Sequence, residues 1–286
     1  MIRLLTVIGH GIELLPHFIN HYKDQVDEIQ IVVYQSDLYP NLRSEVRDII
    51  CEYDNIRIVK TLTERKFDWE KVTSLYNEVK SKYPNDWWII ADIDELHIYP
   101  IKDLKIFIYT IIEKNGWDLV RGGFIDRIGE DGNFPEIISD KSIFEQFPQM
   151  GFFRYPMSNA CPNKVCIMKG YVEITNGQHY AKIDGHTTWR WQGWNHPLIA
   201  PYDQYSVQVH HFKWDKSCID RIKAVAEIKQ DYSYSNEYQL MYDKLKTCNF
   251  KIDIHNKEYM FELSKGIPIF EEYSNWNKLI KKIVSI

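Results

Sequence analysis

The sequence lacks the features that mark membrane proteins, nucleic-acid-binding proteins and disulfide-bonded proteins. Its first apolar run, residues 4–8, is interrupted by Gly9, His10 and Glu13, so neither a signal peptide nor a transmembrane segment is expected. Positive charge is not in excess, because 35 basic and 40 acidic side chains give a net charge of −5, which argues against nucleic acid as a ligand. No C-x-x-C pair occurs among the 5 cysteines, and we expect reduced thiols in a cytoplasmic protein.

The composition is that of a folded globular protein with many aromatic residues. Hydrophobic residues make up 44% and charged residues 26% of the 286 positions, which suffices for a large core without cross-links. Aromatic residues reach 14%, including 9 Trp and 19 Tyr. Most such rings fill cores. Aromatic faces also stack on sugar rings, so some of these residues are candidates for binding a carbohydrate.

Short apolar runs alternate with segments of helical periodicity in the first part of the chain. The expected strands are residues 2–8, 29–34, 56–59 and 87–91, and the expected helices are residues 12–22, 41–50 and 69–79. This alternation predicts an α/β fold, Rossmann-like, with a mainly parallel sheet and helices on both faces. We expect one catalytic domain over residues 1–214, with halves at about 1–96 and 97–214, and a C-terminal helical extension over residues 215–286.

The strongest local motif is an acidic cluster after the fourth expected strand. Asp92, Asp94 and Glu95 follow the apolar run at residues 87–91, and open α/β sheets bind ligands at the carboxyl ends of their strands. Asp92 and Asp94 would face the same side of an extended chain. Crowded carboxylates favour Mn²⁺ or Mg²⁺, which bridge to substrate phosphates. The alternative is a solvated acidic turn.

A second motif lies in the expected strand at residues 207–214. In a strand, His210 and His211 point to opposite faces, so only one of them can join Asp94 at a metal ion. Lys213 shares a face with His211, and an ammonium group beside a metal ligand suits a metal-bound diphosphate. The alternative for this histidine is a hydrogen-bonded structural role.

Together, these motifs and several others resemble those of GT-A fold glycosyltransferases, in the family-2-like group that contains a D-x-D motif. The likeness covers roughly residues 1–215 and depends on the order of the motifs. The matching segments are residues 13–22, the Asp92-Ile93-Asp94-Glu95 motif, residues 124–127, 145–148 and 177–181, and the late His-Phe-Lys-Trp sequence at 211–214.

The resemblance implies a metal-dependent transferase that moves a single sugar from a nucleoside diphosphate sugar to an acceptor hydroxyl, in glycan or polysaccharide biosynthesis. By analogy, Asp94 is the primary ligand of Mn²⁺ or Mg²⁺, Asp92 contacts the donor ribose or the metal, and His211 is a third ligand. The residues expected to bind the rest of the donor are Asp37, Arg127 and Lys213.

A carboxylate is needed to take the acceptor's proton if the anomeric centre inverts. Asp126 is our first choice, because the neighbouring Arg127 would keep it ionised. Asp184, which follows the 177–181 segment, and Asp203 are alternatives. A structural ion pair is the other role considered for Asp126.

The acceptor, a glycan or a lipid-linked sugar, is expected to meet polar and aromatic side chains. Gln178 and His179 could bind sugar hydroxyls. Trp189, Trp191 and Trp194 could form a wall or lid, with plain packing as the alternative. The amphipathic, basic segment at residues 276–286 is expected to pack on the protein, with peripheral membrane contact as a minor alternative.

Two other functions fit parts of the pattern. A nucleotidyltransferase acting on sugar phosphates also pairs carboxylates with a divalent ion, but it would need a Gly-rich, basic loop, and Gly9-His10-Gly11 is a poor match. A carbohydrate-binding protein without catalytic activity would bind sugars without the acidic motif.

Overall fold

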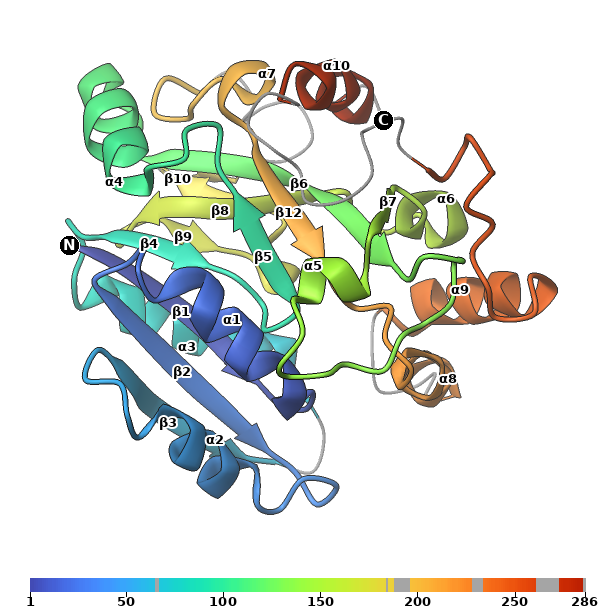
Figure 1. Ribbon diagram of the computed structural model, residues 1–286. Coiled ribbons are helices and arrows are strands. Elements are labelled where there is room, and N and C mark those ends of the chain that lie inside the picture. The colour runs from blue at the N-terminus through green and yellow to red at the C-terminus, as the bar shows by residue number, and fades with distance from the viewer. Residues whose placement is uncertain (65–66, 184, 188–195, 228–233, 261–272, 285–286) are drawn as a thin grey trace. The chain divides into compact units, whose positions relative to one another are not determined.

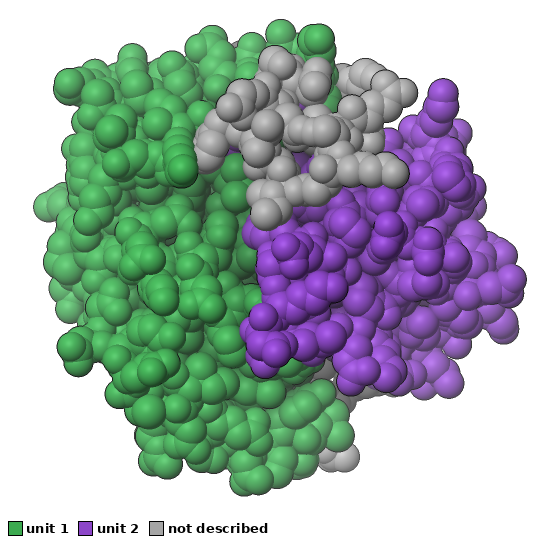
Figure 2. Space-filling model, viewed as in Figure 1, with its two compact units in different colours: residues 1–123, 163–209, 277–286 green, residues 124–162, 210–276 purple. Residues whose placement is uncertain are grey.

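The computed structural model describes residues 1–64, 67–183, 185–187, 196–227, 234–260 and 273–284. The chain divides into two compact units, coloured separately in Figure 2. Unit 1 contains residues 1–123, 163–209 and 277–286, and unit 2 contains residues 124–162 and 210–276. The chain therefore passes from one unit to the other more than once.

Unit 1 is built on a large mixed sheet whose strand order is β3-β2-β1-β4-β8-β6-β12-β5. Its strands are β1 (Ile2–Ile8), β2 (Glu28–Gln35), β3 (Ile56–Thr63), β4 (Trp87–Ile90), β5 (Glu95–Ile98), β8 (Asn163–Lys169), and β6 (Leu119–Ile128) and β12 (Val207–His211), which both continue into unit 2. The first four strands pair in parallel, whereas β8 runs antiparallel to both β4 and β6. The expected α/β fold is confirmed, with an antiparallel part added to the parallel one.

Helices cover both faces of this sheet, as Figure 1 shows for α1 (Leu15–Tyr22) on the near side and α3 (Trp69–Ser81) behind. Pro16 is in the first turn of α1, where a missing N–H costs nothing. The N-cap Asp68 accepts hydrogen bonds from two backbone N–H groups at the start of α3. Val72 and Tyr76 of α3 pack in one apolar cluster with Leu5 and other strand residues.

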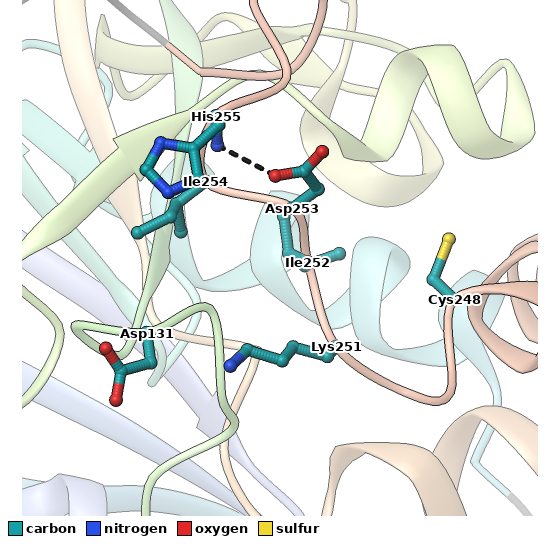
Figure 3. A pocket seen from close by; sticks show the side chains of 7 residues that line it. All are labelled: Asp131, Cys248, Lys251, Ile252, Asp253, Ile254 and His255. Carbon is teal, nitrogen blue, oxygen red and sulfur yellow. Dashed lines mark hydrogen bonds between the residues drawn. The ribbon is translucent and has the colours of Figure 1, made fainter.

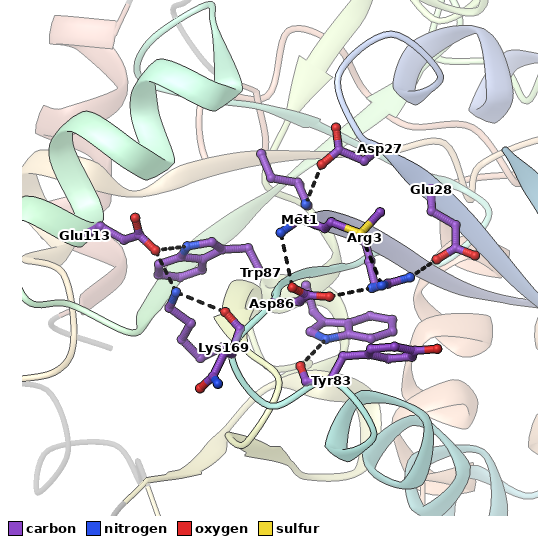
Figure 4. A network of polar contacts seen from close by, with 12 residues as sticks. Met1, Arg3, Asp27, Glu28, Tyr83, Asp86, Trp87, Glu113 and Lys169 are labelled. Atoms are coloured by element: carbon purple, nitrogen blue, oxygen red, sulfur yellow. Dashed lines mark hydrogen bonds and ion pairs between the residues drawn. The ribbon is translucent and has the colours of Figure 1, made fainter.

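A polar network joins the amino ends of β1 and β4 (Figure 4). Arg3 donates to Asp86 over 2.8 Å and also pairs with Glu28, and its guanidinium lies 3.9 Å from the centre of the Tyr83 ring. The terminal ammonium of Met1 pairs with Asp86 at 3.1 Å. These contacts join the amino ends of β1 and β4, while the carboxyl end of β4 leads into the acidic motif.

The other elements of unit 1 are short. They are the helices α2 (Leu42–Ile50), α4 (Leu104–Ile106) and α7 (Tyr202–Tyr205), the π-helix η2 (Phe107–Ile112), the 3₁₀ turns η1 (Ile12–Leu14), η3 (Glu113–Asn115) and η4 (Asn176–Gln178), and a small sheet of β9 (Glu173–Ile174), β10 (Ala181–Ile183) and β11 (His186–Thr187).

Unit 2 is mainly helical. It contains α5 (Ile143–Gln146), β7 (Gln149–Gly151), α6 (Arg154–Ser158), α8 (Cys218–Glu227), α9 (Ser235–Thr247) and the start of α10 (Tyr273–Val284), whose last residues belong to unit 1. Strand β7 pairs antiparallel with the end of β6. An apolar cluster that includes Phe153, Trp214, Ile222 and Met241 forms the core of this unit.

The predicted helical segment after residue 215 contains α8, α9 and α10. In the part of the chain that the structure describes, no helix is both long enough and apolar enough to cross a membrane. Strand β6, which the sequence analysis does not include, extends to Ile128. Strand β5, which the sequence did not predict, begins at Glu95, the last residue of the acidic motif.

Candidate active site

The acidic motif begins immediately after a buried strand. All four residues of β4 are buried, and residues 92–95 then turn, with the Glu95 N–H donating to the Asp92 carbonyl over 2.9 Å. Asp92 and Asp94 are partly exposed, whereas Glu95 is buried. A carboxylate oxygen of Asp94 and one of Glu95 lie within 4.8 Å of each other. The apolar strand thus ends in carboxylates at the sheet edge where α/β proteins bind ligands.

Lys164 of β8 lies between two carboxylates of this motif. Its Nζ is 2.9 Å from Asp92 Oδ2 and 2.7 Å from Glu95 Oε1. Burial alone would lower the pKa of Lys164, but Asp92 and Glu95 raise it above its ordinary value, so the ammonium form is stabilised. The sequence analysis did not identify Lys164. The one feature of the sequence that could have indicated Lys164 is its position as a charged residue directly before the apolar run at residues 165–168.

Gln178 holds the other oxygen of Asp92. Its Nε2 donates to Asp92 Oδ1 over 3.0 Å, and its side chain is 99% buried, with 1% of its surface exposed. The backbone of Gln178 is left-handed, with φ 57°, which is costly for a residue other than glycine. We predicted that Gln178 binds the acceptor sugar. The structure shows its contact with Asp92, and the acceptor-binding role stays a prediction.

His179 contacts the backbone of Asn163, the residue before Lys164 on β8. Its Nδ1 lies 2.7 Å from the carbonyl oxygen of Asn163. The carboxamide of Asn163 accepts a hydrogen bond over 2.9 Å from the Tyr202 hydroxyl. His179, predicted to bind sugar hydroxyls, therefore lies beside the same part of β8 that carries Lys164.

Buried aromatic and imidazole groups surround Glu95. The Tyr22 hydroxyl donates to the Glu95 carbonyl over 3.1 Å and accepts from the His97 N–H over 2.9 Å. His97 Nε2 is 4.0 Å from Glu95 Oε2. Burial, Lys164 and His21 hold the pKa of His97 well below its ordinary value, so its imidazole is neutral. Glu95 and His97 are thus both buried, with a neutral imidazole on this side of the carboxylate.

In unit 2, Asp126 is fully buried and accepts several hydrogen bonds. Its Oδ2 accepts from the backbone N–H groups of Phe153 and Arg154 over 3.0 and 2.9 Å. Its Oδ1 accepts from Trp214 Nε1 over 3.0 Å and lies 3.6 Å from His211 Nδ1. Burial alone would raise the pKa of Asp126, but His211 and Arg154 lower it below its ordinary value. Asp126 is thus ionised and well anchored.

Arg127, the neighbour of Asp126, is also buried and directs its guanidinium to other groups. Its Nε donates to His210 Nδ1 over 3.0 Å, and its Nη1 donates to the carbonyls of Phe147 and Pro148 over 3.0 and 3.2 Å. The role we predicted for Arg127 in donor binding stays a prediction.

Lys213 donates to the Tyr238 hydroxyl over 3.0 Å, and its Nζ lies 4.3 Å from the centre of the same ring. Burial alone would lower the pKa of Lys213, but Tyr238 raises it above its ordinary value. The role predicted for Lys213 at a metal-bound diphosphate stays a prediction.

The remaining predicted residues are exposed or lie outside the described part. Asp37 follows β2 and Asp203 is on α7, and both are exposed. Asp184, Trp189, Trp191 and Trp194 lie outside the residues that the structure describes. Their predicted roles stay predictions.

One pocket of about 480 Å³ lies in unit 2 (Figure 3). It is lined by Asp131, Cys248, Lys251, Ile252, Asp253, Ile254 and His255. The Asp253 carboxylate accepts a hydrogen bond from the His255 N–H over 2.9 Å. None of the site residues predicted from the sequence lines this pocket.

Comparison with known proteins assigns no family. No protein-family model matches the chain, and no curated protein matches it. Among solved structures, mannose-6-phosphate isomerase from Helicobacter pylori is similar, with a TM-score of 0.31 and 15% identity over 59% of this chain and 71% of that one. A structure described as a glucose-1-phosphate thymidylyltransferase from Bacillus anthracis, in complex with sucrose, gives a TM-score of 0.28 and 10% identity over 86% of this chain and 84% of that one. Likeness at this level carries no functional assignment.

Proposed function

We propose that the protein is a metal-dependent glycosyltransferase that transfers one sugar from a nucleoside diphosphate sugar to an acceptor hydroxyl. The observation that carries this proposal is the acidic turn at residues 92–95, directly after the buried parallel strand β4. The sequence resemblance to GT-A glycosyltransferases supports it. Five cysteines without disulfides agree with a cytoplasmic location, which belongs to the same proposal.

The donor set at the acidic turn fits Mn²⁺ or Mg²⁺. Both ions prefer carboxylate oxygens, and Mn²⁺ also accepts imidazole. Within unit 1, Asp94 and Glu95 present oxygens close enough to share a cation. We propose Asp94 as the main ligand, with Asp92 and His211 as further ligands, following the sequence resemblance. When bound, the ion would offset the negative charge that develops on the leaving diphosphate.

The chain's own groups would bind and orient the substrates. Lys213, a buried ammonium in unit 2, would contact the diphosphate, and Asp37 and Arg127 would contact other parts of the donor. Trp189, Trp191, Trp194 and His179 are the proposed acceptor contacts. The acceptor is a glycan or a lipid-linked sugar.

The proton of the acceptor hydroxyl needs a carboxylate base, for which Asp126, Asp184 and Asp203 are the candidates. Asp126 is ionised, as a base must be, but its oxygens already accept three hydrogen bonds from protein groups. It would have to release one of them to reach a hydroxyl. The surroundings of Asp126 therefore favour a role in orienting His211 over proton transfer.

Thermal stabilisation by nucleotides tests the proposed donor site. A ligand that binds only the folded protein raises its melting temperature, so we expect UDP or GDP to do so in the presence of Mn²⁺ and not in EDTA. Asp94→Asn should abolish this stabilisation. Asp54→Asn, which alters an exposed carboxylate of another loop, is the control and should retain it.

Other outcomes separate the alternatives. Stabilisation by free oligosaccharides that survives Asp94→Asn, with no response to any nucleotide, would contradict the proposal in favour of a carbohydrate-binding protein. Formation of a nucleoside diphosphate sugar from a nucleoside triphosphate and a sugar phosphate would identify a nucleotidyltransferase instead.

A further inference from the structure

Lys164 pairs with two of the three carboxylates of the acidic turn. Its role, described next, rests on the proposed metal site. Three carboxylates, those of Asp92, Asp94 and Glu95, follow one strand. Lys164 Nζ lies within 3 Å of two of them, at 2.9 Å from Asp92 and 2.7 Å from Glu95. These distances are typical of charge-assisted hydrogen bonds. Lys164 therefore occupies the position between Asp92 and Glu95.

We propose that Lys164 is a positioning residue that takes the place of a second cation. A divalent ion shared by Asp92 and Glu95 would have to sit where the Lys164 ammonium now lies. Three carboxylates and one ammonium leave two negative charges, which a single divalent cation neutralises. The site consequently binds one ion, for which Asp94 is the principal carboxylate.

Burial makes this arrangement strong. Lys164 and Glu95 each expose only 1% of their surface, and a buried charge without a partner is costly. Removing the ammonium would leave Glu95 buried without its main counter-charge. A cation from solution is then the simplest replacement, because the two carboxylates remain in place.

Gln178 completes the arrangement at Asp92. Because Lys164 holds Asp92 Oδ2 and Gln178 holds Asp92 Oδ1, both oxygens of Asp92 are already engaged within unit 1. The left-handed backbone of Gln178 is a further sign that the fold maintains this contact against strain. The first carboxylate of the motif is thus held by Lys164 and Gln178.

The test compares Lys164→Met with a control on the same strand. Met preserves much of the side-chain volume and removes the charge. Lys169→Met is the matched control, because Lys169 is also on β8 but pairs with Glu113 at 2.7 Å, away from the acidic turn. Melting temperatures are measured in EDTA and in Mn²⁺, and bound Mn²⁺ is counted by electron paramagnetic resonance.

We expect Lys164→Met to have a lower melting temperature than the wild type in EDTA and to regain most of the difference in Mn²⁺. The variant should bind two Mn²⁺ ions per chain, whereas the wild type and Lys169→Met bind one. An equal loss of melting temperature with and without Mn²⁺, together with an unchanged number of bound ions, would show that Lys164 is only a structural ion pair. A wild-type chain that binds two ions would also overturn the proposal.

A double variant covers the case in which Lys164→Met does not fold. Lys164→Met with Glu95→Gln removes one positive and one negative charge, so the charge of the turn returns to its original value. We expect this chain to fold in EDTA and to bind one Mn²⁺ ion. Failure of the double variant to fold would contradict the charge argument.

The outcome also distinguishes this proposal from the proposed function. A wild-type chain that binds no Mn²⁺ contradicts the metal-dependent transferase. If Lys164→Met then gains one Mn²⁺ ion and regains its melting temperature, the role of Lys164 as a substitute cation still holds. If neither chain binds Mn²⁺, both proposals are wrong.

Discussion

Two buried carboxylates with similar chemistry have different partners in this protein. Glu95 is paired with an ammonium group from another strand, whereas Asp126 is held mainly by N–H donors and by the nearby imidazole of His211. An ionised group of either kind is stable in a core only when such partners are present. The partners therefore decide what each carboxylate can do.

Asp126→Asn should reduce stability. In Asn, an NH₂ group replaces one of the two carboxylate oxygens. This NH₂ group would face either the backbone N–H groups of Phe153 and Arg154 or the indole N–H of Trp214. The buried donors on that side would lose their acceptor, at a cost of roughly 1–3 kcal/mol. The free energy of unfolding in urea measures this cost. Asp131→Asn, an exposed change in the same unit, should have no such effect. If Asp126→Asn abolished transfer at unchanged stability, Asp126 would have a chemical role and not an orienting one.

At the residue scale, the sequence revealed the acidic motif but not its partners. Asp92 and Asp94 could be recognised because they follow an apolar run in a regular α/β series. Lys164 and Gln178 lie 72 and 86 residues further along the chain, and no local pattern connects them to Asp92. Only the pairing of β4 with β8 places Lys164 beside the motif.

At the element scale, the parallel half of the sheet was the most predictable part. Strands β1, β2 and β4 are rich in apolar residues and are buried along nearly their whole length, because both faces of the sheet are covered by helices. Strand β5 was missed because it is short and begins inside the acidic motif, at Glu95. The helical segment at residues 104–115 changes type along its length, from a short α-helix to a π-helix and then a 3₁₀ turn.

Helix α3 carries a buried lysine that should make stability depend on pH. Lys80 is fully buried and donates to the Val172 carbonyl, and burial lowers its pKa to about 7 from 10.5. Between these pH values the unfolded chain binds a proton that the folded chain does not. Stability should therefore rise as pH increases from about 7 to about 10.5, and this contribution is lost as pH falls to about 7.

Lys80→Met should flatten this dependence. The free energy of unfolding, measured across this pH range, should rise less steeply for the variant than for the wild type. Lys82→Met, which changes an exposed lysine paired with Glu78 at 3.0 Å, should keep the wild-type slope. Equal slopes for wild type and Lys80→Met would show that Lys80 is charged in the folded protein.

At the scale of the whole molecule, the two compact units are each made from separate stretches of sequence, and α8 and α9 belong with residues 124–162. Local periodicity does not show this grouping, because it depends on the packing of residues far apart in the sequence, such as Phe153, Trp214 and Met241, in one apolar cluster of unit 2. The division into a catalytic domain over residues 1–214 and a C-terminal extension over residues 215–286 stays a prediction.

The central claim, metal-dependent sugar transfer at the acidic turn, is tested most directly by turnover. The purified chain is incubated with a panel of nucleoside diphosphate sugars and glycan acceptors, and released nucleoside diphosphate and glycosylated acceptor are measured with Mn²⁺ or EDTA. We predict Mn²⁺-dependent formation of both products in equal amounts by the wild type and by Asp54→Asn, and a loss of at least about 100-fold in Asp94→Asn, as removal of a group that stabilises transition-state charge typically causes. Transfer at the wild-type rate by Asp94→Asn, or in EDTA, would contradict the claim.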